Sequence, residues 1–211
     1  MRRQAGDFSR TARRLIRERK HMYLHKPEAS SAFHPTMKQD GATYFAEEAF
    51  PFDPSQCVAF TGHRHLSQED LSKIQTHLPP LLEKCYAQGK RAFLSGGALG
   101  FDTVAAGAVL QLRKAHPDVS LILTIPCRSQ ASRWSAGDQA VYAQMLEMAD
   151  QTIYVSEDYF PGCMQKRNQF LIQHADTCIC YLRQCRGGTW YTVSYAYDLH
   201  RTILNLALEK S

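Results

Sequence analysis

The chain has 211 residues, which suits one α/β domain, and an apolar content of 44%, which is ordinary for a globular protein. It has no apolar run approaching the roughly 18 residues of a membrane-spanning helix, and no apolar segment near its start of the kind that a secretory signal has. The seven cysteines are odd in number and lack zinc-binding spacing, so we expect no metal site and a reducing, cytoplasmic location.

The net charge of +5 is concentrated at the N-terminus. The first 26 residues hold nine arginines and lysines against two acidic residues, and the remainder of the chain is close to neutral. We interpret residues 1–55 as a basic extension, in which residues 8–17 have the spacing of an amphipathic helix and prolines interrupt residues 26–54. Such an arm can bind nucleic acid or an acidic partner, or it can remain a solvated extension.

From Cys57 onward, short apolar segments alternate with helical patterns. A capping box at Ser67 and Asp70 starts the first helix, and Pro79-Pro80 divides that helix from a second segment. This alternation predicts a Rossmann-like, doubly wound, mostly parallel sheet of about six strands over residues 56–211, with helices on both faces. The strands are expected at residues 57–60, 91–94, 119–125, 152–155, 177–182 and 202–207.

The loops that follow the predicted strands should meet at the carboxyl edge of the sheet, where open α/β sheets bind ligands. Glycine-rich turns at residues 95–100 and 187–189 lead into helices, and both would present free N–H groups and a positive dipole end to an anion. Neither matches the dinucleotide fingerprint GxGxxG or a P-loop, and each could instead be an ordinary turn with no ligand. Arg128 and Trp134 could offer a cation and a stacking surface, although a lone tryptophan could equally belong to the core.

Four further side chains in these loops carry chemistry. Arg64 and Arg167 could each bind a phosphate or simply lie at the surface, and Asp102 could accept ribose hydroxyls or only complement a helix dipole. His63 could donate to a ligand, and His63 or Asp102 could serve as a catalytic acid or base. The full set of candidate binding residues is Thr61, Gly62, His63, Arg64, Ser95, Gly96, Gly97, Ala98, Gly100, Asp102, Arg128, Trp134, Arg167, Asn168, Gly187, Gly188 and Thr189.

Taken together, the motifs resemble the YpsA-like family of the SLOG superfamily, which also takes in the DprA-type DNA-processing proteins and the LOG-type phosphoribohydrolases. The resemblance runs from about Cys57 to the C-terminus. It implies a Rossmann-like domain that binds a nucleotide or nucleotide-derived ligand, such as ADP-ribose, NAD or AMP, as a sensor or regulator. The residues that carry it are Thr61-Gly-His-Arg64, the run from Ser95 to Asp102, Pro126, Gln130, Trp134, the segment from Met164 to Asn168, and Gly187-Gly-Thr189.

LOG-type enzymes cleave the N-glycosidic bond of nucleoside monophosphates with an arginine, which Arg167 matches, and with the glutamate of a PGGxGTxxE motif. Here that motif reads Arg186-Gly-Gly-Thr-Trp-Tyr-Thr192, so Thr192 stands where the glutamate belongs. The resemblance therefore favours binding over hydrolysis. A LOG-like hydrolase that uses Asp102 or His63 is the alternative, and DNA binding through the basic arm, as in the DprA branch, is a third. A homo-oligomer is left open.

Overall fold

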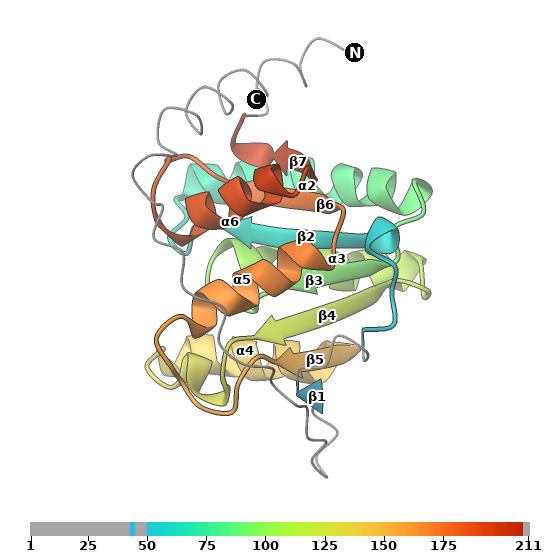
Figure 1. Cartoon of the computed structure of the whole chain (residues 1–211). Helices are drawn as coiled ribbons and strands as arrows, with labels where there is room; N and C mark the ends of the chain where they lie inside the picture. The colour runs from blue at the N-terminus through green and yellow to red at the C-terminus, as the bar shows by residue number, and fades with distance from the viewer. Residues whose placement is uncertain (1–42, 45–49, 209–211) are drawn as a thin grey trace. The chain divides into compact units, whose positions relative to one another are not determined.

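The computed structural model describes residues 43–44 and 50–208, which Figure 1 shows in colour. The basic arm of residues 1–26 and the helix expected at residues 8–17 lie outside these ranges, so both stay predictions. None of the helices in the described ranges has the length and apolar content needed to cross a membrane. Within the same ranges, no three His, Cys, Asp or Glu side chains are grouped so that they could hold a metal ion.

The described residues form one parallel sheet in the spatial order β1-β5-β4-β3-β2-β6-β7 (Figure 1). Six of the strands are those expected from the sequence. The chain runs outward from β2 through β3 and β4 to β5, then returns to the other side of β2, so the strand order reverses between β2 and β6. The strands are β1 (Thr43–Tyr44), β2 (Cys57–Gly62), β3 (Ala92–Ser95), β4 (Ser120–Ile125), β5 (Gln151–Tyr154), β6 (Thr177–Tyr181) and β7 (Thr202–Asn205).

Helices cover both faces of the sheet, and this confirms the doubly wound, Rossmann-like fold. Figure 1 shows α5 and α6 in front of the sheet and α2, α3 and α4 behind it. Each layer has its own apolar core, because α2, α3 and α4 share one buried cluster with the sheet and α5 and α6 share the other. The helices are α2 (Gln68–Ala87), α3 (Phe101–Ala115), α4 (Ala136–Met148), α5 (Cys163–Gln173) and α6 (Gly187–Asp198).

Successive residues of the central strands enter opposite cores. In β2, Val58 packs toward α2 and α3, whereas Ala59 packs toward α5 and α6. Cys178 and Cys180 of β6 are both fully buried in the second core, as expected for alternate residues on one strand face. Burial on both faces explains why these strands read as continuous apolar runs rather than as alternating patterns.

One helix differs from its prediction. The sequence predicts a break at Pro79-Pro80, but α2 continues through both prolines to Ala87. Proline removes a backbone hydrogen bond from a helix and usually kinks it. Here Leu78 and Leu82, on either side of the pair, are buried in the same core, and their packing holds the two halves in line. The capping box at the start of α2 is present as predicted, because the Ser67 N–H donates to Asp70 Oδ2 at 2.8 Å and the Asp70 N–H donates to Ser67 Oγ at 3.1 Å.

Some residues from the range predicted as an extension join this fold. Strand β1 pairs with the edge of β5, with Thr43 opposite Ile153. Phe50 and Phe52 pack against the α5 and α6 core, where the Phe50 ring meets the Phe170 ring edge-on at 5.9 Å. The sheet therefore includes chain that precedes the first predicted strand.

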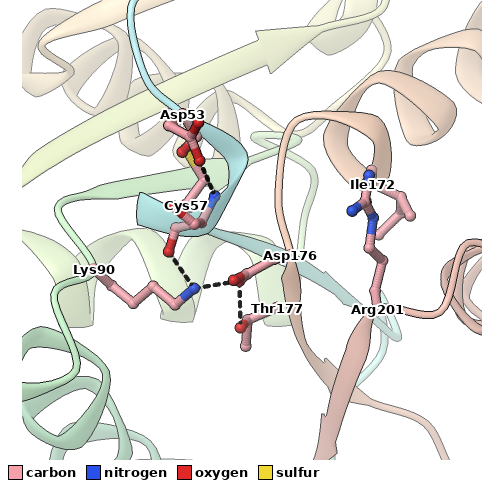
Figure 2. A network of polar contacts seen from close by, with 8 residues as sticks. Asp53, Cys57, Lys90, Ile172, Asp176, Thr177 and Arg201 are labelled. Atoms are coloured by element: carbon pink, nitrogen blue, oxygen red, sulfur yellow. Dashed lines mark hydrogen bonds and ion pairs between the residues drawn. The ribbon is translucent and has the colours of Figure 1, made fainter.

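Polar contacts join neighbouring segments at the amino edge of the sheet (Figure 2). Lys90, which is 6% exposed, pairs with Asp176 and donates to the carbonyl oxygen of Ser55 at 2.6 Å. The Thr177 hydroxyl donates to Asp176 at 2.7 Å, and Arg201 donates to the carbonyl oxygen of Ile172 at 3.1 Å. These polar groups are partnered by other protein groups, so this edge of the sheet has a structural role.

Candidate functional site

A pocket of about 280 Å³ lies at the carboxyl ends of β2 and β6, where the strand order reverses. Open α/β sheets bind their ligands at such a point, because loops from the two halves of the sheet diverge there and leave a crevice. Four segments form the walls: the end of β2 with its loop, the turn after β3, helix α5, and the start of α6. The lining residues are Phe60, Thr61, Gly62, His63, Arg64, Ala98, Asp102, Met164, Arg167, Asn168, Leu171, Arg186, Gly187, Gly188 and Thr189.

Most of the candidate binding residues line this pocket, including both glycine turns in part. Arg128 and Trp134 are not among the lining residues. Arg128 donates to Glu157 at 2.9 Å, and its guanidinium lies 4.6 Å from the centre of the Tyr154 ring. Trp134 packs edge-on against Tyr142 at 5.3 Å, which agrees with its interpretation as a core residue. Ser95, Gly96, Gly97 and Gly100 lie behind the lining, in the turn that supports Ala98 and Asp102.

Four of the lining residues are not among the candidate binding residues expected from the sequence. Met164 lies three positions before Arg167 on α5, and Arg186 is the N-cap of α6, so helical spacing and the glycine turn could have identified both. Phe60 and Leu171 are apolar and fully or nearly fully buried. Nothing in the sequence distinguishes such residues from the rest of the core.

The glycine turn after β3 is shaped by close approaches to its backbone. A Cβ atom at Gly96 would overlap the Arg167 guanidinium and lie 2.7 Å from Asp102 Oδ2, so both side chains occupy the space that a larger residue would need. Gln130 also holds this turn, because its Nε2 donates to the carbonyl oxygens of Gly96 at 3.2 Å and Gly97 at 3.1 Å. The turn is therefore fixed by three side chains from outside it.

Gly100 joins this turn to the loop after β2. Its φ of +78° is a conformation that other residues rarely adopt, and a Cβ there would meet the backbone carbonyls of His63 and Arg64. The next N–H, that of Phe101, donates to the carbonyl oxygen of His63 at 3.1 Å. Two loops that carry pocket residues are thus packed backbone to backbone at Gly100.

Asp102 and Arg167 bring opposite buried charges to the pocket, with exposures of 6% and 5%. Burial raises the pKa of Asp102 to about 6, although Arg167, the Ala98 N–H at 3.4 Å and Arg64 all favour the ionised form. Burial also lowers the pKa of Arg167, and Asp102 opposes that effect. The Arg167 guanidinium donates to the carbonyl oxygen of Gly96 and to Asn168 Oδ1, the latter at 2.8 Å, so the protein rather than solvent orients it.

His63 is held as a neutral ring. Its Nε2 accepts the Arg183 N–H at 3.0 Å, which leaves the proton of the neutral imidazole on Nδ1. Burial and the nearby Arg183 charge lower the pKa of His63, so this tautomer prevails near neutral pH. Arg183 is placed by Asp70, at 3.1 Å, which also accepts the Tyr181 hydroxyl at 2.6 Å. A hydrogen-bond donor is therefore the chemistry that His63 can offer a ligand.

The start of α6 presents backbone N–H groups to the pocket through Gly187, Gly188 and Thr189. No side chain caps this helix start, so its first N–H groups and the positive end of its dipole can interact with an anion. Arg64 also lines the pocket and is exposed, and its guanidinium has no hydrogen bond or ion pair with other residues in the described ranges. The two features together form the part of the pocket that favours negative charge.

Thr192, at the position of the LOG glutamate, lies outside the pocket lining. Its side chain is fully buried, and its hydroxyl donates to the carbonyl oxygen of Gly188 at 2.9 Å within α6. Among the described residues that line the pocket, Asp102 is the only carboxylate. Glycoside hydrolysis usually uses two carboxyl groups, and the pocket lining supplies one of them.

Comparison with curated proteins gives relatives along much of the chain. The SPbeta prophage-derived protein YoqJ of Bacillus subtilis is 31% identical over 137 residues, which cover 59% of this chain and 80% of YoqJ. The UPF0398 protein ABC2016 of Shouchella clausii is 29% identical, with 58% of this chain and 65% of that protein covered. The chain therefore matches slightly less than two thirds of the second relative's length.

Solved structures share the fold. DNA processing protein A from Helicobacter pylori, which binds single-stranded DNA, superposes with a TM-score of 0.51 at 22% identity, over 71% of this chain and 64% of that one. DNA processing protein A from Streptococcus pneumoniae gives 0.53 at 19% identity, over 69% and 48%. The family model described as the YspA SLOG family matches residues 59–202, which include every wall of the pocket. The chain belongs to this family.

Proposed function

We propose that the chain binds a nucleotide or a nucleotide-derived ligand, such as AMP, ADP-ribose or NAD, in the pocket between β2 and β6. The observation that carries this proposal is the charge arrangement across one cavity. The uncapped start of α6 and Arg64 favour an anion, while Asp102 offers a hydrogen-bond acceptor on another wall. A nucleotide carries both an anionic phosphate and ribose hydroxyls, and these are the groups that such a pocket would bind.

The groups divide between the two parts of such a ligand. Backbone N–H groups of Gly187 and Gly188, together with the fork of Arg64, would bind the phosphate. The carboxylate of Asp102 would accept ribose hydroxyls, and Nδ1–H of His63 would donate to an oxygen between them. The apolar wall around Met164 would contact the base or the sugar ring.

The arrangement favours a sensor or regulator over an enzyme. A binding protein needs only complementary groups, whereas hydrolysis of an N-glycosidic bond commonly needs one carboxylate for the leaving group and another for water or the sugar. Asp102 is alone in the lining, and the hydroxyl of Thr192 is already bonded within α6. The pocket therefore supplies recognition more fully than it supplies catalysis.

A thermal-shift panel with AMP, ADP-ribose and NAD tests this proposal. We expect at least one of them to raise the melting temperature, and Arg64→Ala to weaken its binding by about tenfold or more, since a charged hydrogen bond is lost. Lys114→Ala is the matched control, because it removes one exposed positive charge from the last turn of α3, away from the pocket lining. No shift with any ligand, or equal shifts in wild type and Arg64→Ala, would refute the site.

Hydrolysis of a nucleoside monophosphate is the second candidate, and one observation favours it. The pKa of Asp102 is about 6, so a fraction of this carboxyl is protonated near neutral pH and could protonate a leaving group. The geometry places it in the pocket wall, where a bound nucleotide would reach it. Release of free base, dependent on Asp102, would distinguish this candidate from simple binding.

Nucleic-acid binding is a third candidate. The Helicobacter pylori neighbour binds single-stranded DNA, and this chain shares its fold. The basic charge that would serve the same purpose here lies in residues 1–26, outside the described residues. Such binding would depend strongly on salt concentration, because it would rest on contacts with phosphates.

A further inference from the structure

Asp102 is a buried carboxylate whose burial outweighs its polar contacts. One of its oxygens accepts the Ala98 N–H at 3.4 Å, which is near the limit for a hydrogen bond, and the Gly96 N–H also favours its ionised form. Arg167 is close enough to favour the ionised form, but its Nη1 donates to the carbonyl oxygens of Gly96 and Thr124 instead. Burial favours the protonated form of such a carboxyl, and the nearby positive charges and N–H groups only partly oppose this effect.

A negatively charged ligand would shift the balance between the ionised and protonated forms of Asp102. An anion bound by Arg64 and the start of α6 would share the cavity with Asp102, since all of these groups line it. Two negative charges in one buried site disfavour each other's ionised forms. In the empty pocket the positive charges of Arg64 and Arg167 favour ionisation of Asp102. A bound anion would offset part of this effect, because it would interact with the same two charges.

Building on the proposed function, we propose that the pocket takes up a proton on Asp102 when it binds an anionic ligand, so that its affinity for anions rises as the pH falls. The protonated carboxyl no longer repels the ligand; its carbonyl oxygen still accepts a ribose hydroxyl, and its O–H can donate a hydrogen bond to the ligand. Arg167 is then left to balance the charge of the ligand. Binding and protonation therefore assist each other.

The pH range follows from the direction of the change. In the empty pocket the pKa of Asp102 is about 6, and a bound anion raises it further. Between these two values the free pocket is ionised while the occupied pocket is protonated, so the affinity rises by up to about tenfold for each unit of pH decrease. Below the lower value and above the higher value, the affinity stays constant.

The other charged and titratable groups that surround Asp102 are Arg64, Arg167, His63 and Tyr142. His63 lines the same pocket, but its pKa is lowered by burial and its Nε2 already accepts the Arg183 N–H. Tyr142, which interacts electrostatically with Arg167, has a pKa raised by burial and stays neutral.

Isothermal titration calorimetry with ADP-ribose tests the proposal, because the pyrophosphate of this ligand keeps a constant charge over the range. Titrations at about pH 6.5 in two buffers of different ionisation enthalpy give the number of protons taken up. We expect uptake of a substantial fraction of one proton, and an affinity that falls by up to about tenfold per pH unit toward about pH 7.5. Asp102→Asn should bind with a pH-independent affinity near the low-pH value of wild type and take up no proton, whereas His63→Gln should still take one up.

Each outcome decides the matter. Binding of ADP-ribose with no proton uptake would refute the proton linkage and leave the proposed function standing. Uptake that persists in Asp102→Asn would assign the proton to another group. If that variant does not fold, His63→Gln decides: proton uptake that persists in it supports Asp102, and uptake that is lost in it would overturn the proposal. Absence of binding to ADP-ribose, AMP and NAD at every pH would refute the nucleotide site, and this linkage with it.

Discussion

The guanidinium of Arg167 donates a hydrogen bond to the carbonyl oxygen of Gly96, the residue whose missing side chain leaves room for that contact. Arg167 comes from α5 on one face of the sheet, whereas the glycine turn leads into α3 on the other face. The pocket walls from the two layers therefore share one anchor at the carboxyl edge. This contact accounts for both the glycine and the burial of the arginine.

Gly96→Ala should destabilise the protein, because the added methyl group would overlap Arg167 and approach Asp102. We expect a loss of about 1–3 kcal/mol in the free energy of unfolding, as for other overpacked sites. Urea denaturation would measure it. Gly107→Ala is the matched control, since Gly107 is exposed within α3 and a Cβ there meets nothing within 4 Å, so it should gain about 0.5–1 kcal/mol. Equal effects of the two changes would contradict the packing described for Gly96.

Asp102→Asn should change how stability depends on pH. The pKa of this carboxyl is about 6 in the folded protein, against an ordinary value of 3.8. A raised carboxyl pKa contributes stability below the unfolded value and loses it as the pH rises through the folded value. The wild-type protein should therefore lose roughly 3 kcal/mol relative to Asp102→Asn between about pH 4 and about pH 6. Urea unfolding of both proteins over this range measures the difference, and a constant difference would show that the pKa is not raised.

Incubation with AMP should release no adenine above the level seen with Asp102→Asn. The expectation rests on Thr192, whose buried hydroxyl is bonded to Gly188, and on the single carboxylate in the lining. Chromatography of the free base over several hours provides the measurement. Base release by wild type that disappears in Asp102→Asn would instead identify a hydrolase with Asp102 as its acid.

Deletion of residues 1–26 should leave nucleotide binding unchanged, because every residue that lines the pocket lies between Phe60 and Thr189. The same deletion should abolish any salt-dependent binding of single-stranded DNA, since it removes nine basic residues and two acidic ones. Fluorescence anisotropy with a labelled oligonucleotide at two salt concentrations measures the second effect. Tight DNA binding that survives the deletion would show that the arm is not responsible.

Much of the fold could be predicted because the central strands are buried on both faces. Segments such as Ser120–Ile125 are mostly apolar without a polar alternation, and they separate clearly from the helices around them. The two-residue strand β1 has no such run and is defined by its pairing with β5, so no local pattern could reveal it. The continuity of α2 through Pro79-Pro80 also depends on tertiary packing that the local sequence opposes.

The site was predictable where the backbone conformation or the strand order determines it. Gly187 and the loop from Thr61 to Arg64 follow strands that the predicted topology brings to one edge. The side chains were less predictable, because Arg128 and Trp134 follow β4 at the same edge but find partners of their own in Glu157 and Tyr142. Contacts between segments that are distant in the sequence decide which polar side chains face the pocket. These contacts cannot be predicted from the pattern of a single sequence.

The joint at Gly100 links two distant parts of the fold. Helix α3 begins at this joint and ends at the opposite edge of the sheet, where Arg113 in its last turn pairs with Asp150. The length of the helix separates these two ends by about 22 Å. The backbone contact at Gly100 therefore fixes the loop of Arg64 against the same helix whose far end is anchored to the turn before β5.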